Sequence, residues 1–150
     1  MIRYYLLCVA SAGVWAVISY YIGEYWMSPQ IWGGIAVSPL IGLVAGAVYR
    51  PAYRFPFSGR VAMSLFTFYL SVALFGIACG IFDALRELPD GSQRNTIPVI
   101  FQGLAGTFYG VTATGFVGFL WPLAHLNHWF VGRVARCHLQ PLQGPDHPGR

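Results

Sequence analysis

Histidine and cysteine side chains gather near the C-terminal end of the chain, where they could ligate a metal ion or a haem. His125 and His128 are three residues apart and would share one face of a helix, and Cys137 and His138 follow them. Zinc needs three or four such ligands in a tetrahedral array, and this spacing matches no known signature. His125 and His128 are therefore only weak candidate metal ligands.

The acidic residues lie too far away to support these histidines. Ligating histidines usually donate their second ring N–H to a carboxylate. Four of the five acidic residues are expected across a membrane from the histidines, and the fifth lies in the C-terminal tail: Glu24, Asp83, Glu87, Asp90 and Asp146. We therefore predict that both histidines lie at the headgroup boundary, and that replacing both by glutamine changes stability by less than about 0.5 kcal/mol.

The same separation argues against an enzyme. A Ser-His-Asp relay needs its members within hydrogen-bond reach, and the chain has no P-loop, dinucleotide-binding fingerprint or zincin motif. The three cysteines form no CxxC pair. The sequence thus predicts no catalytic residue and no cofactor.

The composition is that of a membrane protein. Only 9% of the residues are charged and 56% are hydrophobic, whereas about 25% are charged in soluble domains. All basic residues are arginines, and they are scattered at the ends of apolar segments, which argues against nucleic-acid binding. The lipid bilayer is therefore the first expected partner.

Four apolar segments, at about residues 4–23, 31–49, 61–82 and 98–121, are free of charged side chains and long enough to cross a bilayer as helices. The first is expected to be a span and not a cleaved signal peptide, because its hydrophobicity continues beyond the Ala10-Ser11-Ala12 triplet. We expect an all-α membrane protein, a four-transmembrane-helix bundle with a short interfacial C-terminal helix after Pro122. The transmembrane domain would cover residues 1–139, and residues 140–150 would be a disordered cytoplasmic tail.

The arginines predict the orientation. Seven of the nine fall on one side of these spans and two on the other, and arginine is enriched on the cytoplasmic side. We expect a multi-pass protein of the plasma (inner) membrane with both termini cytoplasmic. The seven arginines are Arg3, Arg50, Arg54, Arg60, Arg133, Arg136 and Arg150, and the other two are Arg86 and Arg94.

Small residues recur at helical spacing in three of the spans. Lipid offers helices no hydrophobic drive to associate, so close backbone approach matters. We predict that these stripes pack helix against helix, with a homo-oligomer interface as the alternative. They comprise Gly34, Ser38, Gly42 and Gly46, then Gly76 and Gly80, then Gly103, Thr107, Gly110, Thr114 and Gly118.

Three functions remain open. Because no charged residue lies deep in a span, a route for ions or protons is disfavoured, and a non-catalytic accessory, assembly or structural subunit is expected first. The partner would be another membrane protein or a second copy of the chain. A transporter or channel component for a small neutral solute is the alternative, favoured by Pro39 and the hydroxyl groups of the fourth span. The third is a membrane redox protein binding metal or haem through His125 and His128.

Overall fold

The computed structural model describes residues 2–27, 30–86, 95–113, 115 and 117–137, and this part of the chain contains helices and no strand. Five α-helices and one 3-10 helix follow each other along the sequence. They are α1 (Ile2–Met27), α2 (Ile31–Tyr49), η1 (Arg50–Arg54), α3 (Phe57–Ala84), α4 (Thr96–Ala113) and α5 (Val117–Cys137). The predicted disordered tail, residues 140–150, lies outside the described residues.

Several of these helices have the length and composition of membrane spans. Three segments qualify individually, at Ile2–Tyr21, Ile31–Arg54 and Phe57–Ala84, and the α4–α5 pair qualifies only if its two parts count together. The prediction of an all-α protein with long apolar helices is therefore confirmed. The described residues provide three or four segments that could cross a bilayer.

The predicted continuous helix over residues 98–121 is wrong. α4 ends at Ala113, α5 begins at Val117, and the two helix axes differ by 97°. Between them Gly115 has a φ of 72°, in the left-handed region that glycine adopts without steric cost. Such a glycine is a common way to end a helix. The C-terminal helix is consequently longer than expected, 21 residues, and Pro122 lies inside it.

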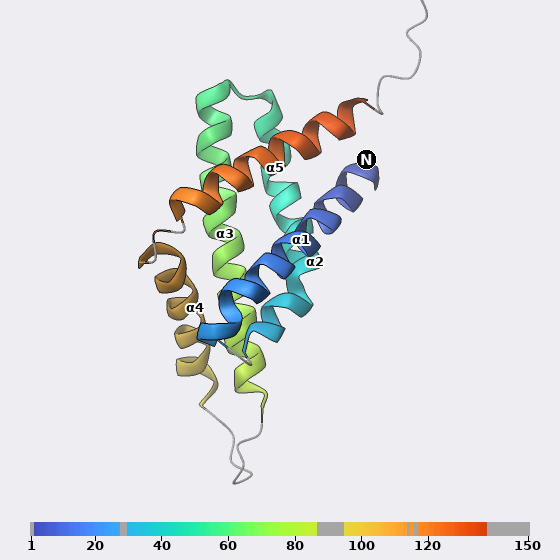
Figure 1. Ribbon diagram of the computed structural model, residues 1–150. Helices are drawn as coiled ribbons and strands as arrows, with labels where there is room; N and C mark the ends of the chain where they lie inside the picture. Colours follow the sequence, from blue (N-terminus) through green and yellow to red (C-terminus); the bar gives the residue numbers. More distant parts are fainter. Residues whose placement is uncertain (1, 28–29, 87–94, 114, 116, 138–150) are drawn as a thin grey trace, which may run out of the picture.

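Helices α1 to α4 pack in chain order, and α5 lies obliquely across them. α1 packs on α2, α2 on α3 and α3 on α4, whereas α5 packs on α3 and α1. In Figure 1 the start of α1, η1 and the end of α5 lie at one end of the molecule. The end of α3 and the start of α4 lie at the opposite end.

Glycines bring three of these helix pairs into close backbone contact, and at Gly33 of α2 an added Cβ would lie 2.6 Å from the carbonyl oxygen of Ala78 in α3. A Cβ added to Gly42 would lie 2.7 Å from the carbonyl oxygen of Cys8, so α1 and α2 touch there. A Cβ added to Gly103 would lie 2.6 Å from both the carbonyl oxygen of Gly76 and the amide nitrogen of Gly80, so α3 and α4 touch as well. These approaches are close enough that no larger residue fits without a shift of the backbone.

The remaining residues of the predicted stripes divide into two groups. Gly34, Gly46, Ser38 and Thr107 are buried. At Gly110 and Gly118, by contrast, an added Cβ would meet no atom within 4 Å. Thr114 lies outside the described residues. The stripe in the fourth span is interrupted because the helix that would have carried it ends at Ala113.

A buried carboxyl group ties α2 to α3 at the end opposite η1. Asp83, in the last turn of α3, is buried, and Gln30, which precedes α2, donates a hydrogen bond from Nε2 to its Oδ2 at 3.0 Å. The carboxylate of Asp83 lies at the helix interface, where a hydrogen-bonded partner offsets part of its desolvation.

Candidate ligand cavity and the adjoining histidines

Both histidines of α5 point into the protein, whereas their expected position at the headgroup boundary stays a prediction. The ring of His128 stacks on that of Tyr49, with centroids 4.0 Å apart and planes inclined by 7°. Its Nε2 lies 3.2 Å from Oγ1 of Thr67. The Nδ1 atom of His125 lies 3.0 Å from Oγ of Ser64. Both imidazoles are thus held against α2 and α3.

The outer face of α5 carries large apolar side chains. Leu126 and Phe130 are 57% and 58% exposed, whereas Ala124 and Val131 of the same helix are buried. In a bilayer, large apolar side chains can face lipid while polar groups find partners inside the bundle. The large apolar side chains of α5 thus lie on its outer face, and its two histidines on the face that packs against the other helices.

Hydroxyl groups of α3 satisfy the two imidazoles. The fully buried hydroxyl of Ser64 donates to the carbonyl of Val61 at 2.9 Å, and it accepts a hydrogen bond from Nε1 of Trp121 at 3.1 Å. That leaves one lone pair on Ser64 for an Nδ1–H of His125. Thr67 likewise donates to carbonyls of its own helix and can accept from His128. Both imidazoles can therefore donate a hydrogen bond to a hydroxyl group of α3.

The 3-10 helix fastens α5 at the same place. The phenol of Tyr53 donates to the carbonyl oxygen of His128 at 2.8 Å, and the ring of Tyr53 lies against Gly132. Tyr49 is almost fully buried beneath His128. We call this set the histidine cluster; it consists of Tyr49, Tyr53, Ser64, Thr67, Trp121, His125 and His128.

The histidine cluster contains few metal-binding groups. Within the described residues, no three side chains of histidine, cysteine, aspartate or glutamate come together. Nothing is described of the side chain of Cys137, and His138 lies outside the described residues. Neutral hydroxyl, phenol and indole groups surround the two imidazoles, and these are not the ligands that zinc prefers.

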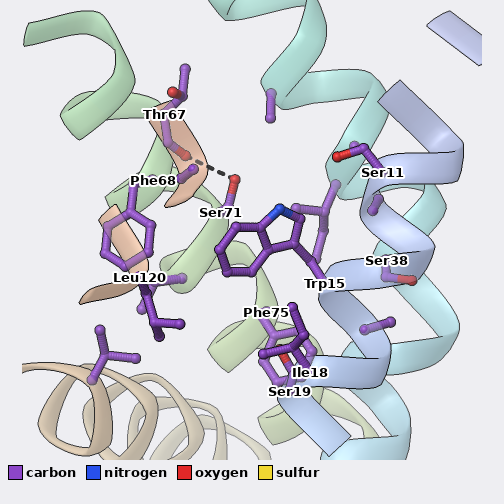
Figure 2. Close-up of a pocket in the computed structure, with 18 of the residues that line it drawn as sticks. Ser11, Trp15, Ile18, Ser19, Ser38, Thr67, Phe68, Ser71, Phe75 and Leu120 are labelled. Atoms are coloured by element: carbon purple, nitrogen blue, oxygen red, sulfur yellow. Dashed lines mark hydrogen bonds between the residues drawn. The ribbon is translucent and has the colours of Figure 1, made fainter. Parts of the chain in front are cut away.

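A cavity of about 620 Å³ lies between all five α-helices and borders the histidine cluster. Its volume is within the range of small-molecule sites in proteins. None of its lining residues is Asp, Glu, Lys or Arg. In Figure 2 the indole of Trp15 projects from α1 into its centre, with Phe68 and Leu120 beyond it. Most of the wall is apolar.

Polar groups are concentrated on one side of Trp15. Asn127 donates from Nδ2 to Oγ of Ser11 at 2.6 Å, which joins α5 to α1. Ser71 donates to the carbonyl oxygen of Thr67 at 2.8 Å. In Figure 2, Ser11 and Thr67 lie above Trp15, whereas Ile18 and Phe75 lie below it. We call Ser11, Thr67, Ser71, Asn127 and His128 the polar pole of the cavity; Ser19 and Ser38 are isolated hydroxyls elsewhere in its wall.

The cavity opens on the side of α4. Tyr109 lines it yet is 74% exposed, and Gly110, which also lines it, has open space where a Cβ would stand. α1 and α4 form no extensive contact with each other, since both pack on other helices. The opening therefore lies beside α4, on the lateral surface of the bundle.

Most residues of the cavity wall were not singled out from the sequence. Ser11, Trp15, Ser71 and Asn127 come from three helices, and no local spacing connects them. Of these four residues, only Asn127 could have been singled out from the sequence. An amide is unusual within an apolar stretch and needs a hydrogen-bond partner there.

Comparison of the chain with protein-family models, with curated proteins and with solved structures finds no match. The geometry of the cavity and of the histidine cluster is therefore the basis for the function.

Proposed function

We propose that this chain is a non-enzymatic, multi-pass membrane protein that binds a small uncharged solute in the cavity between its helices. The observation that carries the proposal is the cavity itself, about 620 Å³ in volume and without a charged lining residue. Of the functions left open by the sequence, this favours the transporter or channel component for a neutral solute. The redox alternative has less support, because hydroxyl groups already occupy the inward edges of His125 and His128.

We further propose four crossings of the plasma (inner) membrane, the fourth being the bent α4–α5 pair, with both termini cytoplasmic. The placement of η1 and the ends of α1 and α5 at one end of the molecule supports this arrangement (Figure 1). So do exposed arginines at that end: Arg3, Arg50, Arg54 and Arg133.

Reporter fusions at three positions test the topology. Fusions after Arg54 and after Cys137 are expected to report the cytoplasm, and a fusion after Arg86 the opposite side. Alkaline phosphatase and a fluorescent protein, which are active on opposite sides of the membrane, give complementary readings. A Cys137 fusion that behaves like the Arg86 fusion would mean that α4 and α5 enter and leave on one side, which rejects the fourth crossing.

Photolabelling tests the cavity as a binding site. The probe is decan-1-ol with a diazirine in its chain, added to the purified protein in phosphatidylcholine vesicles. Saturable labelling is expected on peptides containing Trp15 and Phe75, and excess unlabelled decan-1-ol should compete for it. Gly110→Phe places a ring at the open edge of the cavity and should reduce this labelling at least about tenfold, since a pocket that is filled loses its ligand contacts.

Gly13→Phe is the matched control. Gly13 also has open space at its Cβ, but it does not line the cavity. This variant should label like the wild type. Labelling that is not saturable, or that Gly110→Phe and Gly13→Phe leave equally strong, would refute a ligand site between the helices.

A further inference from the structure

The polar pole contains hydrogen-bonding atoms to which no other group of the described residues is bonded. Asn127 donates one N–H to Ser11, and within the described residues its Oδ1 atom accepts no hydrogen bond. The hydroxyl of Ser11 accepts that bond and keeps its own proton available. The hydroxyl of Ser71 donates to its own helix and keeps its lone pairs. Donors and acceptors are therefore both present on this side of Trp15.

Such groups are costly inside a membrane protein unless something pairs with them. An amide group left without hydrogen-bond partners in an apolar setting destabilises the fold. A ligand with one hydroxyl group would satisfy both a donor and an acceptor of the polar pole, namely the Ser11 hydroxyl and Oδ1 of Asn127. The remainder of such a ligand would have to be apolar, because Trp15, Val72, Phe75 and Leu120 form the rest of the wall.

The charge of the ligand follows from the lining. A carboxylate or an ammonium group would be desolvated in the cavity, and no side chain of opposite formal charge lines it. His128 is the one titratable imidazole in the wall, and its Nε2 is directed at Thr67. A phosphate or carboxylate headgroup is therefore disfavoured.

We infer that the occupant is an uncharged single-chain amphiphile whose hydroxyl head binds Asn127 and Ser11 and whose chain lies beside Trp15 and Phe75. This inference rests on the proposed function and names its substrate class. The ligand enters from the bilayer, because the cavity opens laterally beside Tyr109 of α4. An amphiphile of this kind already partitions into the membrane, so no aqueous route is required.

A competition series with the photolabel described above tests the head group. Unlabelled decan-1-ol, decane and decanoate are compared as competitors at equal mole fractions in the vesicles. Decan-1-ol is expected to compete about tenfold better than decane, the contribution of about one hydrogen bond. Decanoate is expected to compete no better than decane. In Asn127→Leu the advantage of decan-1-ol over decane should disappear, and in Ser11→Ala it should shrink.

Gln102→Leu is the control, since it removes an exposed amide of α4 that does not line the cavity. It should keep the preference for decan-1-ol. Equal competition by decane and decan-1-ol in the wild type would overturn the head-group inference and leave the cavity as an apolar site. Stronger competition by decanoate would overturn it in favour of an anionic ligand. Absence of saturable labelling would reject the proposed function together with this inference. The wild-type series decides without any variant having to fold.

Discussion

Replacing Gly103 by leucine is expected to lower the free energy of unfolding by about 3 kcal/mol or more, which is at the upper end for overpacked sites. The atoms that a Cβ would meet are the backbone oxygen of Gly76 and the backbone nitrogen of Gly80, both 2.6 Å away. A flexible side chain could move aside, but these atoms belong to the α3 backbone. α3 and α4 would therefore have to separate. The loss is measured by unfolding the protein in mixed micelles with an increasing mole fraction of a denaturing detergent. Circular dichroism follows the loss of helix.

Gly110→Leu is the matched control on the same helix. It introduces the same side chain where a Cβ meets no atom within 4 Å, and a change below about 0.5 kcal/mol is expected. Gly103→Ala should fall between the two variants, because it adds the Cβ alone. Equal stabilities for Gly103→Leu and Gly110→Leu would mean that the backbones of α3 and α4 do not touch.

The contrast between Gly103 and Gly110 shows what the sequence could and could not predict about packing. Both belong to one run of small residues at nearly regular spacing, and spacing alone treats them alike. Their different surroundings depend on where α4 ends and on how far α3 extends beside it. Gly115 is one of many glycines in the chain, and nothing in its local sequence distinguishes a helix-ending glycine from a packing one.

The helix content was predictable because it follows from the length of the apolar segments and from their lack of charged residues. A stretch of about 20 apolar residues in a bilayer has few options other than a helix. The cavity was not predictable, since Ser11, Trp15, Ser71 and Asn127 are brought together by the tilt of α1 and α5 across the bundle. Such tilts result from the sum of many contacts and leave no periodic trace in the sequence.

Exchange of both His125 and His128 for glutamine is expected to destabilise the protein by about 2–3 kcal/mol, contrary to the small effect that an interfacial position implied. Glutamine cannot reproduce the stacking of His128 on Tyr49, and its longer, flexible side chain would have to find Ser64 and Thr67 anew. Loss of partners within a buried hydrogen-bonded network is among the more costly kinds of substitution. The same denaturation measurement applies.

Two further variants separate the contribution of the stacked ring from that of the hydrogen bonds and can refute this prediction. His128→Phe retains a ring to stack on Tyr49 but loses the bond to Thr67, so it should lose only about 1 kcal/mol. Arg133→Gln, an exposed position of α5 whose guanidinium lies 5.1 Å from the ring of Trp129, should change stability little. If the double glutamine variant is as stable as Arg133→Gln, the histidines do not fasten α5 to α3.

A visible spectrum and elemental analysis of the wild type and the double variant test whether loss of a bound metal or haem causes the destabilisation. Stoichiometric metal or a Soret band lost with the histidines would identify them as ligands, whereas destabilisation without either places their contribution in the hydrogen bonds and the stacked ring.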